Sequence, residues 1–113
     1  MIEAWLKSWE LPVGVYVGTE AFGRIVIEAC RKFRWRIPED VAIIAGRNEE
    51  LECEISHPTI SSMEFGYDRV GSAAAKLLEQ YMDGMPPSEQ SLLISPRGLV
   101  IRESTSLNSE MIN

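Results

Sequence analysis

The stretch from Val13 to Asn48 constrains the fold more than any other part of the chain, because it predicts a complete β-α-β crossover. Residues Val13–Val17 and Val41–Ala45 are short runs of mainly apolar, β-branched residues. Such runs are typical of strands buried on both faces, as in a parallel sheet. Between them, apolar residues recur at helical spacing and predict the face that a helix packs on the sheet. These residues are Ala21, Phe22, Ile25, Val26, Ala29, Cys30 and Phe33.

Polar side chains follow each of the two predicted strands. Thr19 and Glu20 come after the first strand, and Arg47 and Asn48 come after the second. Because ligands of open parallel sheets bind beyond the carboxyl ends of the strands, these turns are candidate ligand-binding segments. A second interpretation stays open, in which Thr19 only caps the helix and Glu20 only complements its dipole.

The remaining elements follow from periodicity and from the Pro and Gly residues that end them. The expected elements are a helix over Ile2–Trp9, a helix over Glu49–Ile55, a strand over Thr59–Phe65, a helix from Tyr67 to Met82, and β-like runs over Ser91–Ile94 and Leu99–Arg102. Residues 1–10 are interpreted as the end of a truncated helix, and residues 106–113 as a disordered tail. The sequence therefore predicts one α/β domain.

Charge and composition limit the classes of partner that this chain is expected to bind. A net charge of −6 and a pI near 4.8 argue against nucleic-acid binding by this chain, which needs clustered Lys and Arg. The basic residues between Arg31 and Arg36 are expected at a helix end, where cations complement the dipole. No apolar run has the roughly twenty residues of a membrane span, and the N-terminus lacks a signal-peptide pattern. We therefore expect a cytoplasmic protein that does not contact a membrane.

Catalytic and metal-binding patterns are not found in the sequence. His57 is the single histidine, and together with Cys30 and Cys53 it does not make a metal-ligand set. The spacing of Cys53 and His57 would allow a cysteine nucleophile with a histidine base, but no catalytic motif supports this pair. We expect no catalytic residue, no metal and no cofactor. Tyr67, at the start of a helix, is either a ring that stacks on a sugar or one that packs under a loop.

Three separated blocks resemble the effector-binding domains of the lactose-repressor (LacI/GalR) family, in particular the xylose-operon regulators. The blocks are EACRKFRWRIPEDVAIIAGRNEELECEISHPTISSM (28–63), RVGSAAAKLLEQ (69–80) and LLISPRGLVIREST (92–105). The resemblance implies a type I periplasmic-binding-protein-like fold, in which two α/β lobes close on a small molecule. Residues 11–105 would form most of the C-terminal lobe, an incomplete three-layer lobe around a parallel sheet.

The same resemblance implies a function. The chain would be the effector-sensing lobe of a transcriptional regulator that binds a sugar or sugar derivative and forms a homodimer. The first lobe and the DNA-binding module of the family are absent from this chain, so the chain alone is not expected to bind an operator.

Effector contacts of the family fall on named positions here. Its polar pair after the first strand falls on Thr19 and Glu20, its sugar-binding aspartate falls on Arg47, with Asn48 next, and a stacking ring falls on Tyr67. A carboxylate accepts hydrogen bonds from sugar hydroxyls, whereas a guanidinium only donates and favours anions. The Arg47 departure implies either an effector other than a neutral sugar, such as a phosphorylated or acidic one, or a loss of sugar sensing.

Two other functions fit the same residues. A solute-binding protein of a sugar transporter shares the fold, and a ligand-free dimerisation or interaction domain needs no effector. An enzyme that uses Cys53 and His57 is the alternative that the sequence favours least.

Overall fold

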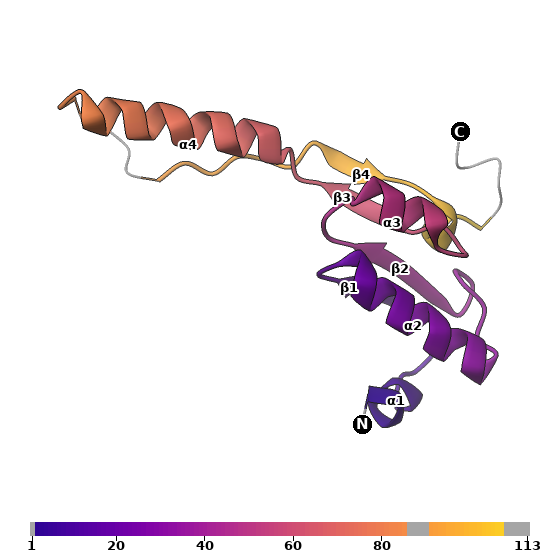
Figure 1. Ribbon diagram of the computed structural model, residues 1–113. Coiled ribbons are helices and arrows are strands. Elements are labelled where there is room, and N and C mark those ends of the chain that lie inside the picture. The colour runs from indigo at the N-terminus through magenta and orange to yellow at the C-terminus, as the bar shows by residue number, and fades with distance from the viewer. Residues whose placement is uncertain (1, 86–90, 108–113) are drawn as a thin grey trace. The chain divides into compact units, whose positions relative to one another are not determined.

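The computed structural model describes residues 2–85 and 91–107 and divides into two compact units (Figure 1). Unit 1 runs to Glu64 and resumes at Gly98, and unit 2 is Phe65–Arg97. Unit 1 contains α1 (Ile2–Lys7), β1 (Val13–Val17), α2 (Glu20–Phe33), β2 (Val41–Ala45), α3 (Glu50–Ile55), β3 (Ser61–Glu64), β4 (Gly98–Val100) and the 3-10 helix η1 (Glu103–Thr105). Unit 2 contains α4 (Tyr67–Met82). The two strands of the predicted crossover are confirmed at both of their bounds.

The four strands form one sheet in the order β1-β2-β3-β4. Strand β1 runs parallel to β2, with Val13 opposite Val41 and Val17 opposite Ala45, and β3 runs parallel to β2. Strand β4 runs antiparallel to β3, which differs from the expected parallel sheet. The chain leaves β3 after Glu64 and returns at Gly98, which lies opposite Glu64, so the returning strand must run the other way. The predicted α/β class is confirmed.

The core of unit 1 lies on one face of the sheet, under α2 and α3 (Figure 1). Val41, Ile43 and Ala45 are fully buried, whereas Ala42 and Ile44 between them are only half-buried. The expectation of strands buried on both faces is therefore met on one face only within this unit. The other face carries a shallow hollow of about 230 Å³ that is lined by Gly14, Val15, Tyr16, Ala42, Ile44 and Thr105.

Helix α2 packs on the sheet through a face that is rotated from the predicted one. Val26, Ala29 and Cys30 are buried as expected, but Phe22 and Ile25 are 57% and 45% exposed. Gly23 faces the core instead, and a Cβ there would lie 3.2 Å from Ile60 Cδ1. Because glycine has no side chain, the helix approaches the core more closely on this side than a pattern of apolar side chains indicates.

Helix α1 is joined to the end of α2 by aromatic side chains. The Trp9 ring stacks on Trp35 with centroids 6.4 Å apart, and Trp5 contacts Trp9 edge to face at 5.1 Å. Leu6 is 1% exposed. The predicted N-terminal helix is thus confirmed over Ile2–Lys7, and its packing explains why this segment carries two Trp residues.

Serine side chains connect η1 to the middle of the sheet. The Ser104 hydroxyl donates to the Ile43 carbonyl at 2.6 Å, and Ser61 N–H donates to Ser104 Oγ at 2.8 Å. Of the tail expected over residues 106–113, residues 108–113 lie outside the described residues. Ser106 is buried, and its hydroxyl donates to the Arg102 carbonyl at 3.0 Å.

Unit 2 consists of α4 and the segment that follows it. Helix α4 begins after Gly66, whose φ of 68° is left-handed, and none of its described residues is buried. The Arg69 guanidinium donates to the Ser95 carbonyl at 2.8 Å, and Arg97 pairs with Asp68 at 2.7 Å. The β-like run expected over Ser91–Ile94 is not a strand. Within residues 2–85 and 91–107, no helix is both long enough and apolar enough to cross a membrane.

Candidate functional site

The candidate site of unit 1 lies at the carboxyl edge of β1 and β2. The two strands end side by side, because Val17 is opposite Ala45 in the parallel register. The loop after β1 therefore meets the loop after β2, and Arg47 N–H donates to Glu20 Oε1 at 3.2 Å. Of the five predicted site residues, Thr19, Arg47 and Asn48 belong to these two loops, and Glu20 is the first residue of α2.

Glu20 lies inside the edge rather than on its surface. Its side chain is 1% exposed. Its Oε1 atom accepts hydrogen bonds from Arg47 N–H, from Glu49 N–H at 3.3 Å and from the Ser62 hydroxyl at 2.9 Å, and Cys53 Sγ lies 3.8 Å away. The expectation of a direct effector contact is therefore not matched by its position. Glu20 instead joins the second loop to β3 and α3.

The charge on Glu20 is stabilised by these donors. Burial alone would raise the pKa of this carboxyl group, because it disfavours the charged form. Hydrogen bonds from its own backbone N–H, from Ser62 and from the backbone of Glu49 and Arg47 outweigh burial, so the pKa lies below its ordinary value of 4.5. Glu20 is a carboxylate at neutral pH, and its Oε1 atom accepts hydrogen bonds from within the protein.

Asn48 is fixed by three hydrogen bonds in a left-handed backbone conformation, with φ 51°. Its N–H donates to Ser62 Oγ at 2.7 Å, and its side-chain amide donates to Glu64 Oε2 at 2.7 Å. Its amide oxygen accepts from Arg102 at 3.0 Å. Asn is enriched at left-handed positions, so its presence here agrees with the tight turn. Both polar atoms of the side chain are already occupied by protein partners.

Arg102 is a site residue that the sequence did not single out. Its guanidinium also donates to Glu54 Oε1 and to the Ile60 carbonyl, both at 2.8 Å, and its side chain is 8% exposed. A buried arginine requires several acceptors, and these come from elements far apart in the sequence. Arginine at the end of an apolar run was the one available signal. Through its hydrogen bond to the Asn48 side chain, Arg102 supports the loop after β2.

Arg47 and Thr19 are accessible at this edge. The Arg47 side chain is 53% exposed and pairs with the exposed Glu49 at 3.5 Å. Thr19 is half-buried and is the N-cap of α2, where its Oγ1 atom accepts from Phe22 N–H at 3.5 Å. The capping interpretation of Thr19 is confirmed, and its hydroxyl still has a proton to donate.

Tyr16 is a second residue that the sequence did not single out. It is 61% exposed and lies on the open face of the sheet, next to the last residue of β1. A Cβ on Gly46 would lie 2.5 Å from the Tyr16 hydroxyl oxygen and 2.8 Å from the Gly18 carbonyl oxygen. Gly46 therefore allows the phenol to lie against the second loop. An aromatic residue in a strand gave no functional signal without this geometry.

Tyr67, the fifth predicted site residue, belongs to unit 2. It is the first residue of α4 and is 57% exposed, and its ring centroid lies 5.9 Å from that of Phe65. An exposed ring beside a second ring has the apolar surface that stacking on a carbohydrate requires.

The pair considered for catalysis lacks a reactive thiol. Cys53 is fully buried, and burial raises the pKa of its thiol to about 11. A thiol with this pKa is protonated and a poor nucleophile at neutral pH. His57 is exposed, and its carbonyl oxygen accepts from Arg31. Among residues 2–85 and 91–107, no group of three His, Cys, Asp or Glu side chains is placed to hold a metal ion.

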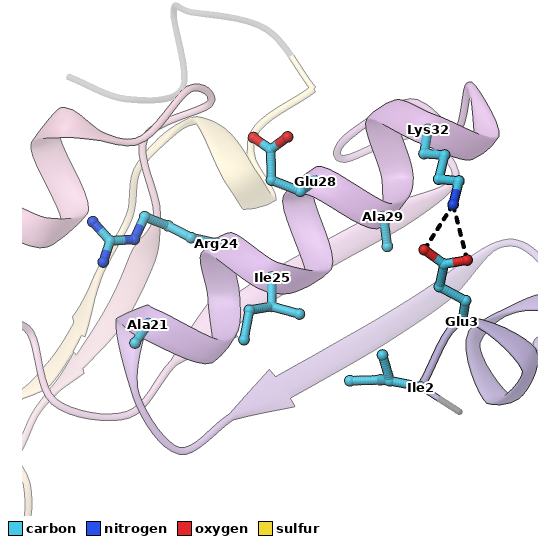
Figure 2. Close-up of a pocket in the computed structure, with 8 residues that line it drawn as sticks. All are labelled: Ile2, Glu3, Ala21, Arg24, Ile25, Glu28, Ala29 and Lys32. Carbon is cyan, nitrogen blue, oxygen red and sulfur yellow. Dashed lines mark hydrogen bonds and ion pairs between the residues drawn. The ribbon is translucent and has the colours of Figure 1, made fainter.

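A larger hollow of about 580 Å³ lies between α1 and the outer side of α2 (Figure 2). It is lined by Ile2, Glu3, Ala21, Arg24, Ile25, Glu28, Ala29 and Lys32. Lys32 and Glu3 form an ion pair at 2.8 Å that joins the two helices at one end. This surface contains none of the predicted effector residues.

Comparison with known proteins places these features in a family. The family model of the periplasmic binding protein-like domain matches residues 1–105 of this chain. The xylose operon regulatory protein of Haemophilus influenzae is 34% identical over 105 residues, which are 93% of this chain and 27% of that protein. The protein of the same name in Escherichia coli K12 is 30% identical over the same shares. The chain thus spans about a quarter of the length of these curated relatives.

Solved structures agree with the sequence matches. The structure of the xylose-binding transcription activator xylR gives a TM-score of 0.80 at 30% identity and covers 96% of this chain and 28% of that chain. A LacI family transcriptional regulator from Arthrobacter, in complex with lactose, gives a TM-score of 0.74 at 31% identity. The match covers 92% of this chain and 38% of that chain. The relatives found are transcriptional regulators rather than enzymes.

Proposed function

The chain belongs to the periplasmic binding protein-like domain family, and from this premise we propose that it is the effector-sensing lobe of a transcriptional regulator. The observation that carries the proposal is the match to sugar-responsive regulators over nearly the whole chain, together with the two loops that meet at the carboxyl edge of β1 and β2. Ligands of open α/β sheets bind at this edge. The effector proposed here is a sugar or a sugar derivative.

The proposed mechanism is a population shift. In a two-lobed regulator, a ligand held by both lobes favours the closed arrangement of the lobes. That arrangement changes the geometry of a dimer and thereby its affinity for DNA. This chain supplies one half of the ligand site, and DNA is bound only by a module outside this chain. A regulator of this kind acts in the cytoplasm.

The residues of the edge have different proposed roles. Arg47 and Thr19 are exposed enough to contact the effector, and Asn48 fixes the loop that carries Arg47. Glu20 acts through the loop as a positioning residue, since its carboxylate is buried. Tyr67, in unit 2, is proposed as a ring that stacks on a sugar, on the strength of its exposed aromatic face.

We also propose that the intact regulator is a homodimer and that the hollow between α1 and α2 contributes to its interface. Apolar side chains of Ile2, Ala21 and Ile25 line this surface, and charged side chains of both signs stand among them (Figure 2). A surface that combines apolar side chains with charges of both signs suits an interface between two identical copies.

Two alternatives predict different observations. A solute-binding protein of a sugar transporter would bind a sugar with no effect on DNA binding by any module joined to it. A ligand-free dimerisation domain would form the dimer and bind no sugar at all. The regulator proposal requires both binding and coupling.

A thermal-unfolding screen tests the proposal against a panel of pentoses, hexoses, sugar phosphates and sugar acids. A ligand stabilises the state that binds it, by about 2.7 kcal/mol at a hundredfold excess over the dissociation constant. We expect at least one sugar or sugar derivative to raise the melting temperature of the 113-residue chain. Replacing Arg36, an exposed arginine before β2 at the opposite edge of the sheet, by Gln should leave the shift unchanged. No shift with any compound would favour the ligand-free domain.

A further inference from the structure

Three side-chain acceptor atoms at the carboxyl edge are already occupied. Glu20 Oε1 accepts hydrogen bonds from two backbone N–H groups and one hydroxyl, and the amide oxygen of Asn48 accepts from Arg102. Glu64 accepts from the Asn48 amide group. A ligand rich in hydroxyl donors would therefore compete with the protein for these three oxygen atoms.

Apart from the Glu49 carboxylate, the side chains that remain accessible at the same edge are donors. Arg47 is 53% exposed on its side chain, and its guanidinium has five N–H groups, of which the Glu49 pair uses one nitrogen. The Tyr16 hydroxyl lies against Gly46, the residue before Arg47, and makes no hydrogen bond within the described part of the chain. The Thr19 hydroxyl can also donate. The accessible edge thus has the Arg47 guanidinium, two neutral donors and the Glu49 carboxylate that pairs with Arg47.

The ion pair of Arg47 is easily exchanged for a ligand. Its N···O distance of 3.5 Å is longer than the roughly 2.7–2.9 Å of a charge-assisted hydrogen bond, and both partners are more than half exposed. Exposed pairs of this kind contribute little to stability, about 0–1 kcal/mol. An anionic group that binds the guanidinium through two oxygens has better geometry than Glu49.

The base of Arg47 is rigid, which limits the entropy that binding must overcome. Its N–H group is held by Glu20, and the next residue, Asn48, is held by three hydrogen bonds in a left-handed turn. Gly46 on the other side is buried against the Tyr16 ring. Preorganised donors bind more strongly than mobile ones, because fewer degrees of freedom are lost.

We propose that the effector is a sugar that carries a carboxylate or a phosphate, with Arg47 binding the anionic group and Tyr16 lying against the carbohydrate. This inference rests on the proposed function and specifies the effector class for the same site. The Tyr16 ring offers an apolar face to the sugar and a hydroxyl donor at its rim.

Nuclear magnetic resonance of the ¹⁵N-labelled 113-residue chain tests the proposal, since amide shifts detect weak binding by half of a ligand site. The probes are matched sets on one carbon skeleton: D-xylose, D-xylonate and D-xylose 5-phosphate, then D-glucose, D-gluconate and D-glucose 6-phosphate, with inorganic phosphate alone. We expect at least one charged sugar to shift Gly46, Arg47 and the Arg47 side-chain resonance and to bind about tenfold more tightly than its neutral parent.

Variants of the loop sharpen the result. Arg47→Gln should weaken binding of the charged sugar about tenfold, and Arg47→Lys should fall between Gln and the native residue because it keeps the charge but loses the planar fork. Glu49→Gln removes the competing carboxylate and should tighten binding about two- to threefold. Arg47→Asp should reverse the preference towards the neutral sugar. Arg36→Gln, at the opposite edge, should change none of these affinities.

Each other outcome has a definite meaning. Neutral sugars that bind as tightly as their charged counterparts overturn the inference and leave the proposed function standing. Inorganic phosphate that binds as tightly as the sugar phosphates indicates an adventitious ion only and also overturns the inference. An absence of shifts with every compound overturns both the inference and the proposed function.

Discussion

Helix α2 buries six of its residues, whereas none of the described residues of α4 is buried. The two helices nevertheless have similar sequences in outline. Each carries an acidic residue in its first turn, Glu20 or Asp68, a glycine in its amino-terminal half, Gly23 or Gly71, and an apolar stripe at helical spacing. The local pattern therefore determined that both segments are helical, but it did not determine what each helix contacts.

The difference lies in what flanks each helix. Helix α2 connects β1 to β2, which are neighbours in parallel register, and a crossover between paired parallel strands packs on the sheet they form. The unit that contains α4 follows Glu64 and precedes Gly98, and these two residues are opposite each other in an antiparallel pair. The crossover rule that applies to α2 therefore does not apply to α4. Burial thus follows from topology, and the predictions below test whether it does so in solution.

The largest expected contrast is between Ile27 and Leu78, which are 4% and 61% exposed. Ile27→Ala should destabilise unit 1 by about 3 kcal/mol, because it removes buried methylene groups and leaves a cavity. Leu78→Ala should change stability by less than about 1 kcal/mol. Urea unfolding followed by tryptophan fluorescence measures the first effect, since all three Trp residues lie in unit 1. Far-UV circular dichroism, which includes α4, measures the second.

A loss at Leu78 as large as the loss at Ile27 would contradict the comparison. It would mean that the apolar face of α4 is covered in solution. Dilution would then show whether a second copy covers this face. If it does, the stability of the protein falls as the protein concentration falls.

The next contrast is between the acidic residues of the first turns. Glu20→Gln keeps the size of the side chain but weakens the hydrogen bonds to Arg47, Glu49 and Ser62, so it should cost about 1–2 kcal/mol. Asp68→Asn affects an exposed carboxyl group that pairs with Arg97, and we expect no measurable change in stability. Equal effects of the two substitutions would show that burial of Glu20 does not matter to the fold.

The lowered pKa of Glu20 also predicts how its contribution to stability changes with pH. The pKa of Glu20 is lowered in the folded chain, so the unfolded chain takes up the proton first as pH falls. The stability that Glu20 contributes is therefore present above its ordinary pKa of 4.5 and is lost as pH falls through the lower folded value. The difference in unfolding free energy between the native chain and Glu20→Gln should narrow below pH 4.5. A difference that stays constant with pH would contradict a charged Glu20.

The sequence predicted the elements better than their contacts. The bounds of β1 and β2 followed from apolar runs, and those of α4 followed from periodicity and its terminal Asp-Gly. The buried face of α2 was predicted about one residue out of register, because a pattern of apolar side chains gives no weight to Gly23. The antiparallel direction of β4 depends on a pairing between Glu64 and Gly98 that no local signal encodes.

The candidate site shows the same division. Parallel strands bring their carboxyl ends together, so the approach of the Thr19 and Arg47 loops could be predicted from two short runs. The burial of Glu20 could not, because its hydrogen-bond partners lie 27 to 42 residues away in the chain. Arg102 and Tyr16 entered the site only through long-range packing. Polar side chains at a strand end therefore predict a candidate site, and the fold decides which of them remain accessible.

The smallest contrast concerns the two glycines. A Cβ at Gly71 would meet no atom within 4 Å, so Gly71→Ala should stabilise α4 by about 0.5–1 kcal/mol through helix propensity alone. A Cβ at Gly23 would lie 3.2 Å from Ile60 Cδ1, whose side chain is fully buried, so crowding should cancel or exceed the same gain in α2. Thermal unfolding by far-UV circular dichroism compares the two variants under one set of conditions. A stabilising Gly23→Ala would mean that Ile60 relaxes easily, and that the close approach of α2 to the core comes from the β1–β2 crossover rather than from its glycine.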